Sequence, residues 1–271
     1  MYRMLIPVDR KVDRALHQAR YAANLAESGA DVEATVLYVD PPGNADAVDV
    51  VFDSIDAAVG AADHLEAKGV SVERLVEEGS VVETVLRTAD ELDSHEIVMG
   101  GRKRSGVAQV LLGSTVQDVF VSTERPVTIT GAEMVVEDGP RTVIVPVDEN
   151  KSHARKQAAY VAELGSVAPD VKAVVLHVFP GQDYKGAPPH SFEDNEAAVE
   201  AADDLTDRGI EVERIGIGGN VAQKILETTA EREAHGIVMG GRKRSGVQKV
   251  LLGSIAQDVL LSADRPVTLT G

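Results

Sequence analysis

Cysteine is absent from this chain of 271 residues. Its absence excludes disulfide bonds, thiol catalysis and zinc sites built on cysteine. No apolar run approaches the roughly 18 residues that a membrane-spanning helix needs. The segment Met1 to Pro7 is too short for a secretory signal, and charged residues follow it too closely. We therefore expect a cytoplasmic protein that has no association with a membrane.

Positive charge is scarce, and aromatic residues make up only 3% of the chain. The chain has 44 Asp and Glu against 27 Lys and Arg, which gives a formal net charge of −17. Such a field repels nucleic acid and anionic lipid, so we expect no nucleic-acid partner. Carboxylates crowd the predicted surface, which favours the salt-rich cytoplasm of a halophilic prokaryote. An ordinary acidic protein is the alternative.

One segment occurs twice. Residues 97–107 read IVMGGRKRSGV, and residues 237–247 repeat these letters without a change. The letters VLLGS follow each copy after two residues and end in Gly113-Ser114 and Gly253-Ser254. An apolar run, a basic loop with glycine, and Gly-Ser before an amphipathic segment are typical of a phosphate-binding loop between a strand and a helix. The duplication predicts two domains, residues 1–131 and 140–271, with a linker over residues 132–139.

Apolar β-branched runs alternate with amphipathic, alanine-rich or acidic segments in both halves. The predicted strands are 3–9, 32–39, 70–76, 96–99 and 126–130, then 141–148, 171–178, 210–217, 236–239 and 266–270. The predicted helices are 14–28, 45–68, 81–92 and one from 114, then 153–164, 192–208, 221–233 and one from 254. This alternation predicts an α/β fold. Each half is expected to be a doubly wound, Rossmann-like unit with a five-stranded parallel sheet, helices on both faces and strand order 3-2-1-4-5.

The last strand of each half is short, apolar and terminal. Left unpaired, residues 127–130 and 267–270 would be exposed sheet edges. We expect them to pair with each other across a pseudo-two-fold axis, so that the halves form an internal pseudo-dimer. Ligands of such sheets bind beyond the carboxyl ends of the strands, where the strand order reverses.

The spacing within the repeated loop is Gly100, two residues, Lys103, nine residues, Gly113 and Ser114. In the second half the same spacing joins Gly240, Lys243, Gly253 and Ser254. Together with a first strand that ends in Pro-x-Asp and a valine at the end of the second strand, this pattern resembles the universal stress protein family. The resemblance is to a tandem two-domain member, and it covers essentially the whole chain.

The resemblance implies a regulatory protein of the stress response that binds ATP or another adenine nucleotide, with or without Mg²⁺. In nucleotide-binding members the pattern is Gly-x2-Gly-x9-Gly-(Ser/Thr), and ATP lies over the sheet edge. Carried over by position, residues near the ribose and base are Pro7, Asp9, Val39, Pro146, Asp148 and Val178. Those at the end of strand four and around the phosphates are Met99, Gly100, Arg102, Lys103, Gly113, Ser114, Met239, Gly240, Arg242, Lys243, Gly253 and Ser254.

Lys103 and Lys243 depart from the family pattern, which has glycine at this position. Glycine permits a positive φ or a close approach of backbone to phosphate, and lysine does neither cheaply. The Arg-Lys-Arg clusters can bind phosphate through their side chains instead. The alternative is a protein that binds no nucleotide and acts through partner contacts or dimerisation.

Simpler explanations exist for the other signals. The basic clusters can be counter-ions for nearby carboxylates. Ser114 and Ser254 are expected to be helix N-caps whether or not phosphate binds, and Asp9 and Asp148 can be turn formers. The sequence has no nucleophile elbow, no Walker P-loop and no paired histidines, so no base for a slow ATPase can be named. We expect binding and no enzymatic activity.

Overall fold

The computed structural model describes residues 1–42, 50–103, 110–111, 113–131, 141–182, 189, 191–241 and 253–271. For residues 102, 103, 110 and 111 only the backbone is described. None of the described helices has the length and apolar character needed to cross a membrane.

Strands and helices alternate in both halves, as the sequence predicts. The first half contains β1 (Tyr2–Val8), α1 (Val12–Glu27), β2 (Val32–Asp40), the 3-10 turn η1 (Phe52–Ser54), α2 (Asp56–Ala67), β3 (Ser71–Glu78), α3 (Val81–Glu91), β4 (Glu96–Gly100), β5 (Arg102–Lys103), β6 (Val110–Leu111), α4 (Ser114–Ser122) and β7 (Val127–Thr130). The second contains β8 (Thr142–Pro146), α5 (Lys151–Val167), β9 (Lys172–Pro180), the 3-10 turn η2 (Phe192–Asp194), α6 (Glu196–Asp207), β10 (Glu211–Gly219), α7 (Val221–Glu231), β11 (Gly236–Gly240), α8 (Ser254–Ser262) and β12 (Val267–Thr270).

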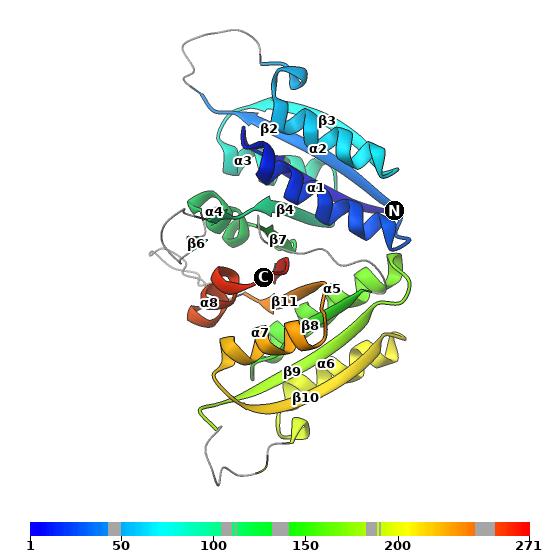
Figure 1. Ribbon diagram of the computed structural model, residues 1–271, viewed down its shortest axis with the longest axis vertical. Coiled ribbons are helices and arrows are strands. Elements are labelled where there is room, and N and C mark those ends of the chain that lie inside the picture. The colour runs from blue at the N-terminus through cyan, green and yellow to red at the C-terminus, as the bar shows by residue number, and fades with distance from the viewer. Residues whose placement is uncertain are drawn as a thin grey trace.

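A single ten-stranded sheet runs through both halves in the order β10-β9-β8-β11-β12-β7-β4-β1-β2-β3 (Figure 1). In this sheet the paired strands within each half are parallel, and the order 3-2-1-4-5 is confirmed. The halves join where β7 and β12 pair antiparallel, with Thr128 opposite Thr268. The predicted pairing of the two fifth strands is therefore confirmed.

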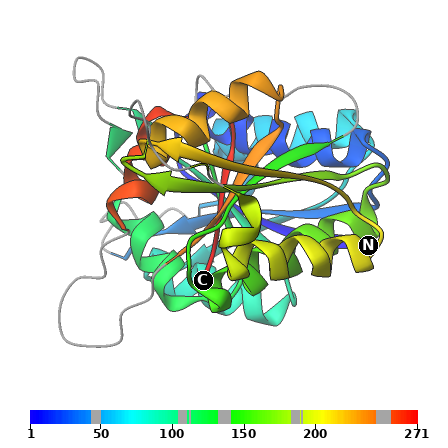
Figure 2. The same cartoon turned by 90° about the horizontal axis from the view of Figure 1, so that it is seen from below.

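Helices cover both sides of this sheet (Figure 2). Residues of α1, α2, α5 and α6 belong to one hydrophobic core, and residues of α3, α4, α7 and α8 to the other. Alanine on the sheet-facing side of α1 lets the helix approach closely, and Ala15, Ala19 and Ala22 have no exposed surface. The carboxyl ends of the parallel strands in each half consequently meet at one edge, between two helical layers.

Two predicted helix starts are wrong. The second helix of the first half does not begin at Ala45, which lies outside the described residues, because η1 and then Ile55, in an extended conformation, precede α2. In the second half α6 begins after Asn195 rather than at Phe192, because the Asn195 side chain accepts a hydrogen bond from the Ala198 amide and caps the helix. Composition alone does not show that an aromatic residue before the helix turns into the core.

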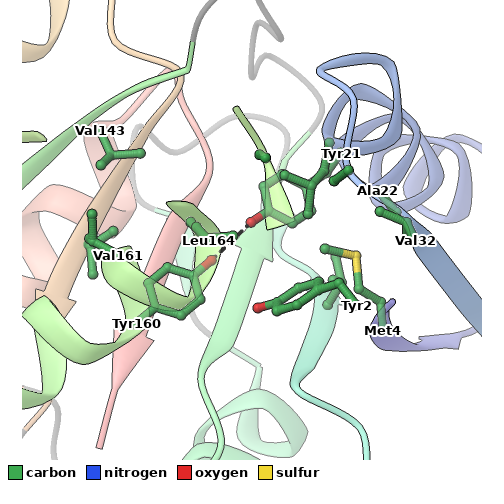
Figure 3. Packing of buried hydrophobic residues seen from close by; sticks show 14 of the residues in the cluster. Tyr2, Met4, Tyr21, Ala22, Val32, Val143, Tyr160, Val161 and Leu164 are labelled. Atoms are coloured by element: carbon green, nitrogen blue, oxygen red, sulfur yellow. Dashed lines mark hydrogen bonds between the residues drawn. The ribbon is translucent and has the colours of Figure 1, made fainter. Parts of the chain in front are cut away.

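A buried carboxylate lies at the junction of the halves. Glu96, the first residue of β4, has no exposed surface. Its Oε2 accepts hydrogen bonds from the hydroxyls of Tyr2 (2.9 Å) and Tyr160 (3.2 Å), and its Oε1 accepts from Tyr21 (3.0 Å) and Thr128. Tyr160 comes from the second half, and its hydroxyl points toward that of Tyr21 (Figure 3).

The hydrogen bonds around this carboxylate continue across the junction. The Thr128 and Thr268 hydroxyls are 2.6 Å apart, and the buried Arg141 donates to the Asn24 side-chain oxygen at 2.6 Å. Burial raises the pKa of the Glu96 carboxyl, while hydrogen bonds from the four hydroxyls oppose that rise. The junction thus holds one carboxylate whose charged form is costly.

We predict that this carboxylate makes stability depend on pH. Because its folded pKa lies above its unfolded value, its contribution is fully present below the unfolded pKa and is lost as pH rises through the folded pKa. The unfolding free energy of the wild type should therefore fall, relative to Glu96→Gln, by about 1.4 kcal/mol for each pH unit between the two pKa values. Urea unfolding of both proteins from about pH 4 to about pH 8 measures this difference.

The exposed Glu83 provides the matched control. The difference between the wild type and Glu83→Gln should stay nearly flat over the same range. A Glu96→Gln difference that is flat, or that rises with pH, would contradict the prediction.

Candidate functional site

A cavity of about 900 Å³ lies at the carboxyl edge of the sheet in the second half. The ends of β8, β9 and β11 and the start of α8 surround it. Seven of the residues that the sequence nominates for this half line the cavity: Pro146, Asp148, Val178, Met239, Gly240, Gly253 and Ser254. Residues far apart in the chain are thus brought to one concave surface. The other two nominated residues, Arg242 and Lys243, lie outside the described residues.

The nominated residues of the first half lie at the equivalent edge. Pro7 is the second-last residue of β1, Val39 lies near the end of β2, and Met99 and Gly100 are the last two residues of β4. Asp9 follows β1, Gly113 caps α4 and Ser114 is its first residue. The backbone of Arg102 and Lys103 forms β5, which pairs antiparallel with β6.

A buried glutamine bonds two strand ends beside the second-half cavity. Strands β8 and β11 pair only at Val143 with Gly236 and at Ile144 with Ile237. Past that point the Gln157 amide of α5 donates to the carbonyl oxygens of Pro146 and Val238, at 2.8 Å each. Gln157 is only 1% exposed. Gln157 therefore satisfies the backbone where the two strands separate, at the position where a ligand can enter.

Gln18 of α1 does the same in the first half. It donates to the carbonyl oxygens of Pro7 and Val98, at 2.8 Å each. Sequence reasoning did not single out these glutamines. Their common signal is that each half has glutamine eleven residues after the proline of its first strand.

The two aspartates after the first strands form local turns, and their side chains remain partly exposed to solvent. Asp148 accepts a hydrogen bond from the Asn150 amide at 2.9 Å, and its other oxygen lies 3.3 Å from His153 Nδ1. Asp9 accepts from the Lys11 amide at 2.9 Å and forms an ion pair with Arg14. The turn-forming role is confirmed for both. Their side chains are 48% and 42% exposed, so each can also accept a hydrogen bond from a ligand.

The two glycines that line the cavity have different surroundings. A Cβ on Gly240 would lie 2.7 Å from the His153 Cβ, so this glycine lets α5 pack against the end of β11. A Cβ on Gly253 would meet no atom within 4 Å among the described residues, and its φ of −55° suits any residue. The described packing therefore requires glycine at position 240 and leaves space beside position 253.

The start of α8 differs from the prediction. Gly253, and not Ser254, is the N-cap, and Gly113 likewise caps α4. Because glycine has no side chain, no side-chain cap bonds the first-turn amides of either helix in the described structure. Those amides are donors that need an acceptor, and an anion at the helix start can supply it.

No group of three or more His, Asp or Glu side chains suited to a metal occurs in the part of the chain that the structure describes. The cavity lining instead combines apolar strand residues with several carboxylates and a glycine-capped helix start. These features suit an organic molecule that has an apolar part and polar groups that can hydrogen-bond to the lining.

We predict that Gln157→Leu destabilises the protein. The change removes two hydrogen bonds and leaves two carbonyl oxygens of the separating strands with one partner fewer, a loss of about 1–3 kcal/mol in unfolding free energy. Gln223→Leu, on the exposed side of α7, is the matched control and should change stability by less than about 0.5 kcal/mol. Equal effects of the two changes in urea unfolding would refute the role of Gln157.

Comparison with known proteins gives the family. The model of the universal stress protein family matches residues 1–131 and again 140–271. A universal stress protein of Mycobacterium tuberculosis is 25% identical over 211 residues, which is 74% of this chain and 71% of the relative. The crystal structure of a universal stress protein from Archaeoglobus fulgidus has the same fold, with a TM-score of 0.73, 24% identity and coverage of 98% of this chain and 97% of that one. The chain belongs to the universal stress protein family.

Proposed function

We propose that this protein is a regulatory protein of the stress response that binds adenine nucleotide at the carboxyl edge of its sheet. The observation that carries the proposal is the cavity of about 900 Å³ at the point where β8 and β11 separate. Pockets that hold small ligands are of this size and lie at this position in doubly wound folds. The lining residues come from the segments that carry the family pattern.

The chemistry of the lining supports a nucleotide with its base and phosphates at opposite ends. In the proposed complex the ribose hydroxyls donate to Asp148, and the base packs beside Val178. The phosphates accept from the amides at the start of α8, where Gly253 leaves room for them. Arg242 and Lys243, which follow β11 in the sequence, add positive charge for the phosphates.

The proposed activity is binding rather than turnover. Hydrolysis of a phosphoanhydride needs a group that positions or deprotonates water, and the motifs of the sequence name no such group. ATP, ADP and AMP all remain ligands to test. Mg²⁺ would enter with the phosphates, because the lining residues that the structure describes offer no cluster that suits a metal.

We predict that the purified chain binds adenine nucleotide and that Gly253→Val removes binding at the second half. Valine meets no described atom here but would fill the space left for phosphate, so affinity at that site should fall by more than about tenfold, or about 1.4 kcal/mol. Titration calorimetry with ATP, ADP and AMP in high KCl measures this. The matched control is Gly60→Val in α2, where a Cβ also meets nothing within 4 Å.

Two results would count against the proposal. If neither half binds any of the three nucleotides, the chain is a partner-binding member of the family, in keeping with lysine at positions 103 and 243. If Gly253→Val and Gly60→Val bind equally at both sites, the ligand lies elsewhere.

A further inference from the structure

The cavity in the second half is acidic for a site that would hold phosphate. Its lining includes four carboxylates, Asp148, Glu149, Asp194 and Glu196, against one ammonium group, Lys151. Lys151 already pairs with Glu196 at 2.9 Å and with Glu200 at 3.7 Å. The described surroundings therefore favour a ligand of low negative charge.

The equivalent positions in the first half carry a different set of charges. Arg10, Lys11 and Arg14 stand where the second half has Glu149, Asn150 and His153. The carboxylates at the equivalent described positions are Asp9, Asp40 and Asp56, so three cations face three anions there. Compared with the second half, this edge is more positive by three charges.

The cationic side chains of Arg14 and Arg10 lie at the carboxyl edge of the first-half sheet. Arg14 packs over Gly100, because a Cβ there would collide with its side chain, and it pairs with Asp9. The Arg10 guanidinium lies 5.2 Å from the centre of the Tyr38 ring, and Tyr38 is the equivalent of the cavity-lining His177. Among the described residues Arg10 and Lys11 form no ion pair, so both charges are available to an anion.

The basic loops reduce this contrast without removing it. Residues 102–107 and 242–247 are identical in sequence, but two residues later Gln109 corresponds to Lys249, which gives the second half one more positive charge. With this lysine counted, the first half remains more positive by two charges. The remaining difference comes from the segments after β1 and β8 and from the segments before α2 and α6.

We propose that the two halves bind adenine ligands of different charge. The first half takes a nucleoside di- or triphosphate, and the second half takes an adenine nucleoside or monophosphate. This rests on the proposed function, because it assigns a ligand class to each of the two nucleotide sites. A single chain would then respond to the phosphorylation state of the adenine pool by which of its halves is filled.

The test is titration calorimetry of the full chain with ATP and with adenosine. The second site is identified by its loss in Asp148→Ala, because ATP and adenosine share the ribose hydroxyls that donate to Asp148 in the proposed complex. At the first site ATP should bind at least about tenfold more tightly than adenosine, whereas at the second site the two affinities should agree within about threefold. Raising KCl to about 1 M should shrink the ATP preference of the first site, because screening at that concentration acts over about 3 Å.

Exchanging the charge at two exposed positions tests the role of charge directly. Glu149→Arg should raise the ratio of ATP affinity to adenosine affinity at the second site by about fivefold, and Arg10→Glu should lower this ratio at the first site by a similar factor. The matched controls are Asp207→Arg, at the far end of α6, and Arg20→Glu, on α1. Both residues are exposed and lie away from the cavity lining, and both controls should leave all affinities within about twofold.

The outcomes separate the two proposals. If neither ATP nor adenosine binds, the proposed function fails and this inference fails with it. If both sites bind but prefer ATP to the same extent, or if the controls act as strongly as the site variants, the division of ligands is refuted while nucleotide binding stands.

Discussion

The antiparallel pairing of β7 with β12 is the constraint on which the architecture depends. It joins two five-stranded sheets into one of ten strands and removes the edges that two short apolar strands would otherwise expose. It also brings Thr128 opposite Thr268 and places Tyr160 of the second half against Glu96 of the first. The buried hydroxyls give that carboxylate its hydrogen bonds, so the strand pairing and the polar cluster support each other.

On each side of this junction the sheet continues to a carboxyl edge where two strands separate. In each half the first and fourth strands pair for two residues and then separate, and a buried glutamine bonds the carbonyls that separation leaves. The crevice therefore follows from the strand topology, and the side-chain amide of one glutamine in each half supplies hydrogen bonds to the backbone carbonyls there. The loops after β1 and β8, which border this crevice, differ in charge between the two halves.

Much of this could be predicted from the sequence, because hydrophobic patterns that occur in both halves indicate the same elements twice. The alternation of apolar runs and amphipathic segments indicates the doubly wound units, and the terminal position of residues 127–130 and 267–270 indicates their pairing. The start of α2 could not be predicted, because burial of Ile55 is a tertiary effect. The same holds for the capping glycines, Gly113 and Gly253, since Gly-Ser gives no local sign of which residue is the cap. The glutamines were missed because their role depends on where two distant strands separate.

Glu96 makes the junction asymmetric. Its position in the second half is taken by Gly236, so the junction holds one carboxyl group rather than a symmetric pair. Two copies of the first half, joined in the same way, would bury two carboxyl groups beside each other, and two copies of the second half would leave their hydroxyls without this acceptor. The junction is therefore complete only with one copy of each half, so the internal pairing of these two domains excludes its symmetric alternatives.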